Sequence, residues 1–192
     1  CEDDVIIGVV PNVGDVGQAG GFVFHVDTIN NIIYEVAPKS TEIGGFGMRW
    51  GCWGTPVLPS PTLGTSIGMG KINTNEIIAA GCPDPTPWAT YLDTLIYNGY
   101  DDWFAPSYNE WLKLWFNIGP GQALLSPLYN LADLDDLKPF SGSTDQPPIW
   151  ITSSEHPANP VYDTIAIGLP TTWGTTMQVL QKNFLFMWLR PV

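Results

Sequence analysis

Basic residues are the scarcest charged group in this chain. Seven Lys and Arg stand against 19 Asp and Glu, so the formal net charge is −12 at pH 7, and only 14% of the residues are charged. Proteins that bind nucleic acid need clustered Lys and Arg, which neutralise phosphates and release counterions. The composition therefore excludes nucleic acid as an expected partner, and it disfavours acidic lipid surfaces and sulfated glycans for the same reason.

Long apolar runs and several common catalytic motifs are also missing. The longest uninterrupted apolar stretch is 184–189, far short of the roughly 20 residues that span a bilayer. The chain has no His-Glu-x-x-His motif and no phosphate-binding loop, and no Cys-x-x-Cys or Cys/His cluster of a zinc site. The run 153–156 joins two serines, an acid and a histidine, but a triad is defined by geometry, not by adjacency. We therefore expect no cofactor, no bound metal and no enzymatic reaction.

Cysteine occurs three times, which is an odd number. Cys52 and Cys82 can form a disulfide and leave Cys1 over, whereas in a reducing compartment all three would be free thiols. A bond that closes a loop of about 30 residues would contribute on the order of 3 kcal/mol to stability.

The sequence opens with Cys1-Glu2-Asp3-Asp4. Bacterial lipoproteins have such a first residue, because their signal peptide is cut just before a cysteine that takes the acyl chains. The acidic run resembles the export signal of Bacteroidetes-type surface lipoproteins. We expect Cys1 to anchor the protein on the extracellular face of a bacterial outer membrane, with residues 1–12 as a tether. The alternative is that position 1 is an arbitrary start.

Aromatic residues, glycine and proline are abundant: 9 Trp, 7 Tyr, 8 Phe, 20 Gly and 18 Pro. The length predicts a single domain, 13–192, after the tether. Alternation of apolar residues and turn signals predict strands at 21–27, 32–37, 149–153, 162–168, 175–181 and 184–190. The stretches 38–70 and 120–148 follow no period, and we expect long irregular loops there.

Three helices are predicted between the early and late strands. Their expected starts are cap residues: Asn73 or Thr74, then Thr86 before Pro87, and then Ser107 with Glu110 in a capping box. Their expected ends are Gly81, Asn98 and Gly119. Strands at both ends with helices between them predict an α+β domain whose terminal strands meet in one sheet.

Six blocks of the chain, in order, resemble the Lcl-type C-terminal domain, a bacterial domain of unknown function with a C-type-lectin-like fold. They are VGDVGQAGGFVFHVD (13–27), RWGCWGT (49–55), IGMGKINTNEIIAAG (67–81), NGYDDWFAPSYNEWLKLW (98–115), WITSSE (150–155) and LRPV (189–192). The resemblance implies paired terminal strands, two to three helices and long loops on one exposed face. It also implies that Cys52 pairs with Cys82, and that Asp102 and Trp103 hold their loop to the core. The calcium ligands of C-type lectins have no equivalent spacing in 155–160.

The nine tryptophans suggest a binding surface, because flat rings stack on sugar faces. Trp50, Trp53 and Trp173 lie on expected loops or strand ends, whereas Trp103, Trp111 and Trp115 have the spacing of core residues. We expect 38–70 and 120–148 to form the partner-contacting face. Contact there would depend on aromatic and apolar burial, so that binding changes little with salt.

We interpret the chain as a non-enzymatic, surface-exposed binding module. Its partner would be a surface glycan, a protein of an outer-membrane assembly, or another copy of itself. Two alternatives stay open. The same fold could serve as a receptor-binding domain on a phage fibre or virion, or the chain could be an enzyme derived from the formylglycine-generating fold, with Cys52 and Cys82 as reactive thiols.

Overall fold

Two separate sheets and three helices form an α+β fold in the computed structural model, which describes residues 10–46, 48–58, 63–82, 87–120, 126–128, 131–132, 149–160, 163–168, 176–182 and 186–192. The strands are β1 (Phe22–Asp27), β2 (Ile32–Val36), β3 (Ile43–Phe46), β4 (Ile149–Glu155), β5 (Asp163–Gly168), β6 (Thr176–Gln181) and β7 (Phe186–Leu189). The helices are α1 (Met69–Ala79), α2 (Pro87–Thr94) and α3 (Tyr108–Ile118), with short 3-10 turns at Lys39–Thr41 and Leu63–Thr65.

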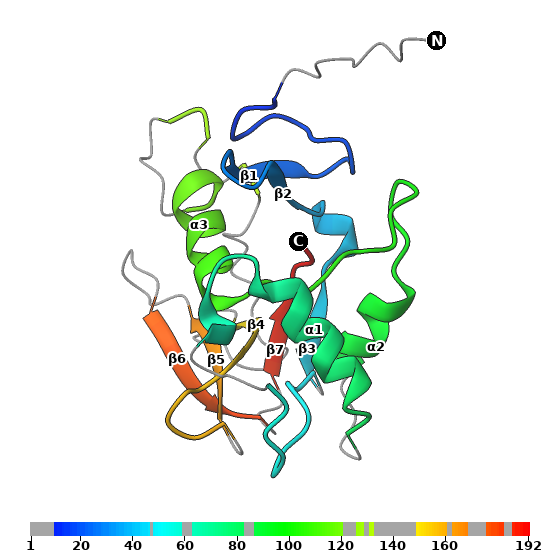
Figure 1. The fold of residues 1–192 in the computed structure, drawn as a ribbon, viewed down its shortest axis with the longest axis vertical. Coiled ribbons are helices and arrows are strands. Elements are labelled where there is room, and N and C mark those ends of the chain that lie inside the picture. Colours follow the sequence, from blue (N-terminus) through cyan, green and yellow to red (C-terminus); the bar gives the residue numbers. More distant parts are fainter. Residues whose placement is uncertain are drawn as a thin grey trace.

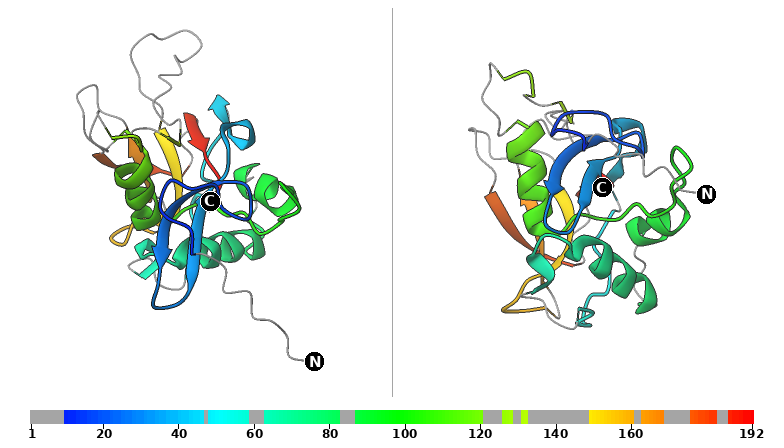
Figure 2. Two further views of the ribbon diagram at one scale, coloured as in Figure 1. Left: turned by 90° about the horizontal axis from the view of Figure 1, so that it is seen from above. Right: turned by 45° about the horizontal axis from the view of Figure 1, so that its top comes forward.

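The β1–β2 hairpin lies at one end of the molecule and the larger sheet at the other (Figure 1). Figure 2 shows the hairpin between α3 on one side and the pair α1 and α2 on the other. The helices α1 and α3 both contact β4, and α3 also contacts β1. The helix α3 therefore joins the hairpin to the larger sheet.

The expected single sheet with both terminal strands is wrong. The larger sheet has the order β3-β7-β4-β5-β6, and β1 and β2 pair only with each other in the part of the chain that the structure describes. The strand β3 takes the edge of β7. Its Gly44-Gly45 pair has no strand propensity, so the sequence predicted a loop there. Between the hairpin and the C-terminal segment, one backbone bond runs from the Ala37 amide to the Pro191 carbonyl, at 3.0 Å.

The predicted N-terminal cap is correct for α3 but not for α1. The capping box of α3 is confirmed: Ser107 accepts from the Glu110 amide, and the Glu110 carboxylate accepts from the Ser107 amide at 2.7 Å. The prediction for the start of α1 is wrong, because Gly68 is the cap, with φ 87°. Asn73 and Thr74 are buried inside the helix instead.

The boundaries of α2 are confirmed only at its start. The helix begins at Pro87 as predicted, but it ends at Thr94 rather than near Asn98. Its predicted cap, Thr86, lies outside the described residues.

The core consists of two aromatic clusters. One lies between α3, the hairpin and β4, where the Trp111 and Trp150 ring centroids are 5.2 Å apart. The other includes residues of α1 and α2 and contains the Trp50 and Trp88 rings at 6.1 Å. The predicted core positions of Trp111 and Trp115, and of Trp103 in the second cluster, are confirmed.

Irregular segments are held to this core by buried glutamates. The carboxylate of Glu155 accepts the backbone amides of Val57 and Leu58 at 2.8 and 2.9 Å. It also forms an ion pair with Lys182 at 2.5 Å, and both side chains are fully buried. The Lys182 ammonium donates to the Thr55 carbonyl at 2.7 Å. These bonds give the loop after Cys52 the partners that a helix or strand would otherwise supply.

Glu110 anchors a second irregular segment. Besides closing the α3 capping box, its carboxylate accepts the amides of Gly68 and Gly70 at 2.7 and 3.3 Å, where α1 begins. Burial raises the pKa of this carboxyl, and the hydrogen bonds from the backbone amides of Ser107, Gly68 and Gly70 oppose that effect. One side chain thus organises the first turns of two helices.

The disulfide between Cys52 and Cys82 is present and is expected to contribute strongly to stability. Replacing both residues (Cys52→Ala with Cys82→Ala) should lower the free energy of unfolding by about 2–4 kcal/mol, because the unfolded chain is no longer constrained by the closed loop. Urea denaturation measures this, with the reduced wild-type protein as the matched comparison. Thiol labelling of Cys52 in the native, oxidised protein would contradict the bond and would favour a reactive cysteine.

The raised pKa of Glu110 predicts a pH-dependent difference between the wild type and Glu110→Gln. The native wild type holds this proton more tightly than the unfolded chain does. Its stabilising effect is therefore fully present below the unfolded pKa, about 4.3, and is lost as the pH rises through the folded value. The unfolding free energy of the wild type minus that of Glu110→Gln should increase from neutral pH to about pH 4. A difference that decreases over this range would mean that the folded pKa is lowered.

Candidate binding groove

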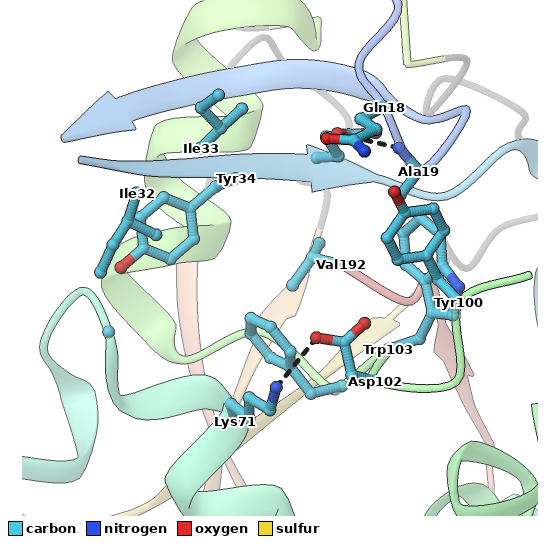
Figure 3. A pocket seen from close by; sticks show the side chains of 13 residues that line it. Gln18, Ala19, Ile32, Ile33, Tyr34, Lys71, Tyr100, Asp102, Trp103 and Val192 are labelled. Atoms are coloured by element: carbon cyan, nitrogen blue, oxygen red, sulfur yellow. Dashed lines mark hydrogen bonds and ion pairs between the residues drawn. The ribbon is translucent and has the colours of Figure 1, made fainter. Parts of the chain in front are cut away.

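A groove of about 410 Å³ runs beside β2. One wall is β2 itself, from Ile32 to Glu35. The other wall is formed by Gly68 and Lys71 at the start of α1 and by the segment 100–104, and Val192 lies between the walls (Figure 3). The volume is in the range of cavities that hold ligands, which are usually 300–1,000 Å³.

The β2 wall presents a strand edge and apolar side chains. Figure 3 shows β2 between β1 and the groove, so the edge of β2 that β1 does not use faces the groove. Ile32 and Ile33 are each 43% exposed, and Ile29 in the turn is 89% exposed. A two-stranded hairpin cannot bury both of its faces, which is why these apolar residues stay in contact with solvent.

The turn of the hairpin is set by its own polar residues. The Asp27 carboxylate accepts the amides of Ile29 and Asn30 at 3.0 Å each, and Asn31 takes the left-handed conformation with φ 56°. Hydrogen bonds from the Asn30 side chain and backbone lower the pKa of Asp27. The carboxylate therefore stays ionised, and it holds the hairpin in the register that places Ile32 and Ile33 at the groove.

The opposite wall carries an exposed ion pair. Lys71 and Asp102 lie 2.9 Å apart, and more than half of each side chain is exposed, so the pair contributes little to stability. The Asp102 carboxylate joins its loop to α1 through Lys71 at the surface, and its role in holding the loop to the core stays a prediction. Trp103 does hold the loop: it is buried and contacts the edge of the Tyr97 ring at 6.0 Å between centroids. Its indole nitrogen has no hydrogen-bond partner among the described residues, so the anchoring is by packing.

The floor of the groove is tied by backbone bonds. Phe104 and Val192 exchange two amide–carbonyl hydrogen bonds, both of 2.9 Å.

Tyr34, on the β2 wall, is buried, and burial together with the charges of Glu110 and Asp27 raises the pKa of its phenol. The phenol therefore stays protonated at neutral pH and can donate a hydrogen bond.

The tryptophans proposed from the sequence do not form this site. The prediction for Trp50 is wrong: the ring is fully buried, and its indole N–H donates to the Thr152 carbonyl at 2.9 Å. The Lys182 ammonium lies 4.6 Å from its centroid. Trp53 is 48% exposed beside the disulfide, but it does not line this groove. Trp173 and Cys1 lie outside the described residues.

The expected partner-contacting face also differs from the groove. The segment 38–70 contains β3 and the start of α1, and most of 120–148 lies outside the described residues. The groove is built mainly from the hairpin and the segment 100–104, which the sequence did not assign to the contacting face. The sequence did contain one signal for the groove, the run Ile32-Ile33-Tyr34. Successive side chains of a strand point to opposite faces, so this strand has apolar side chains on both faces. A two-stranded hairpin cannot bury both faces, and some of these side chains therefore stay exposed.

The lining of the groove contains one ion pair, Lys71 with Asp102, and no His or Cys. No three His, Cys, Asp or Glu residues among those that the structure describes are arranged to hold a metal ion. Ser153, Ser154 and Glu155 are fully buried, and Glu155 is engaged by Lys182. No helix in the described ranges has the length and hydropathy to cross a membrane. The groove itself can bury apolar side chains and exchange backbone hydrogen bonds.

Comparisons of the chain with protein-family models, curated proteins and solved structures found no match. The resemblance to the Lcl-type domain therefore stays a prediction, whereas the α+β class is evident from the helices and sheets themselves.

Proposed function

We propose that this chain is a non-enzymatic binding module and that the groove beside β2 is where it holds a protein partner. The observation that carries the proposal is the groove itself, with a strand edge on one wall that no described strand pairs with, and exposed Ile32 and Ile33 beside it. A glycan site needs many hydrogen-bonding side chains around a sugar, whereas apolar walls suit protein side chains. Lys71, which lines the groove, is paired with Asp102.

We further propose that the fold is C-type-lectin-like, that residues 1–12 form a tether, and that Cys1 carries a lipid on the extracellular face of a bacterial outer membrane. Two features support this. The Cys52–Cys82 bond is typical of exported proteins, since cytosolic thiols are kept reduced. The contact of Ala37 with Pro191 brings the end of the hairpin beside the C-terminal segment, as in folds whose termini meet.

The groove can be tested by photo-crosslinking on intact cells. A benzoylphenylalanine at position 33 should crosslink to a discrete protein, whereas the same group at position 116 on α3 should not. Phe116 is 52% exposed, close to the 43% of Ile33, so it is a matched control. Ile33→Asp should weaken binding of the captured partner by about tenfold or more, which corresponds to about 1.4 kcal/mol, and should leave the melting temperature nearly unchanged.

Three outcomes would contradict this assignment. Crosslinking from position 53 but not from position 33 would move the site to the disulfide loop around the exposed Trp53. Crosslinking to glycan alone would replace the protein partner. Full binding by Ile33→Asp would show that the β2 wall takes no part.

The lipid anchor makes a separate prediction. Cys1→Ala should release the protein from the membrane into the soluble fraction. The acyl chains on Cys1 are the only anchor that we propose, and without them no hydrocarbon is buried in the bilayer. Fractionation measures the release, and the intact mass of the mature wild type reports the acyl chains directly. Retention of Cys1→Ala on the membrane at the wild-type level would contradict lipid anchoring.

A further inference from the structure

We propose that the partner binds as an extended strand along the free edge of β2 and that its side chains alternate between apolar and basic. This inference rests on the proposed function of the groove and adds the conformation and the charge of the occupant. A strand that adds to a sheet edge gains main-chain hydrogen bonds for affinity, and alternate side chains provide specificity.

The two edges of the hairpin are in different situations. The edge of β1 is already used: the Gly14 amide donates to the Val23 carbonyl at 2.8 Å, the Val23 amide donates to the Asp15 carbonyl at 2.9 Å, and Val16 bridges to Phe22. The edge of β2 has no strand partner among the described residues. An isolated two-stranded sheet is marginal, so a third strand on β2 would stabilise the hairpin as well as the complex.

A backbone hydrogen bond already joins another segment of the chain to the end of the hairpin. Just beyond the end of β2, the chain's own Pro191 accepts a backbone hydrogen bond from Ala37 at 3.0 Å. A neighbouring backbone is thus already at pairing distance on this side of the hairpin. An added strand would continue that contact along β2, over a floor that includes Phe104 and Val192.

The charges around the groove select a basic occupant. The carboxylates of Glu35 and Asp102 belong to the β2 wall and to the 100–104 segment, and Asp101 is exposed next to Asp102. Glu35 is engaged by the amides of Ala19 and Gly21. Lys71 is the cation of this lining, and it is already paired with Asp102. Uncompensated negative charge therefore remains at the rim.

The same charges oppose a second copy of this chain. Each copy has a net charge of −12, and like charges brought together at an interface are unfavourable. In an added strand, successive side chains point to opposite faces. Apolar side chains would cover Ile32 and the floor, and basic side chains between them would reach Asp101 and Asp102.

Synthetic peptides of about seven residues, enough to span β2, test this directly. The probes are an alternating Val/Lys peptide, the same peptide with Glu in place of Lys, and the Val/Lys peptide with alternate backbone nitrogens methylated. The Val/Lys peptide should slow amide hydrogen exchange in 32–36 by about tenfold or more. The Glu peptide and the methylated peptide should not, because one has the wrong charge and the other cannot complete the ladder.

Variants separate the charge from the edge. Asp101→Asn with Asp102→Asn should weaken the Val/Lys peptide by about two- to fivefold, as expected for exposed ion pairs, and should reduce its salt dependence. Asp93→Asn is the matched control, since Asp93 is exposed on α2 and does not line the groove. Equal binding of the Lys and Glu peptides would overturn the basic occupant. Equal binding of the methylated peptide, or no protection of 32–36 by the Val/Lys peptide, would overturn strand addition.

The failure of this inference can be told from the failure of the proposed function. If position 33 still crosslinks to a protein while the Val/Lys peptide leaves exchange in 32–36 unchanged, the groove binds its partner in another conformation. If position 33 crosslinks to nothing, both proposals fail. Protection of 32–36 that appears on concentrating the protein alone, together with a doubled mass by light scattering, would replace the basic strand with a second copy of the chain.

Discussion

Backbone amides outside helices and strands must find acceptors, and in this chain glutamates that are buried or partly buried accept several of them. Glu35, Glu110 and Glu155 each accept two or more amides from segments far away in the sequence. A buried carboxylate without such partners would be strongly destabilising, and an amide without an acceptor would be too. The irregular segments and the glutamates therefore depend on each other, and the rest of the structure depends on this mutual satisfaction.

The groove is one consequence of these anchors. Glu35 holds Ala19 and Gly21 against the hairpin, and Glu110 holds Gly68 at the start of α1. Both held segments line or border the groove on opposite sides. Its walls are thus fixed by partly buried hydrogen bonds, while its surface is made of strand edge and apolar side chains. Rigid walls reduce the entropy that a partner must lose on binding.

Burial also changes how the scarce basic residues are used. Lys182 and Arg190, two of the seven, are buried in ion pairs with Glu155 and Glu42. Arg190 in addition donates to the carbonyls of Ala37 and Ala132. These cations connect segments inside the fold and are not available for surface contacts. The outer surface is left with few cations, which is why the occupant proposed for the groove is basic.

The sequence by itself determined the local features: the α3 capping box of Ser107 and Glu110, the β1–β2 hairpin, the central placement of Trp111 and the α+β class. Each depends on residues a few positions apart, or on their pattern within one element. The tertiary structure alone decided that Trp50 is buried, that α1 begins after Gly68 and that β3 takes the edge of β7. Those outcomes rest on partners distant in the sequence: Glu155 and Val57 are 98 residues apart, and Glu110 and Gly68 are 42 apart. No local pattern encodes such a pairing, because it forms only when the folded core brings both groups out of water together.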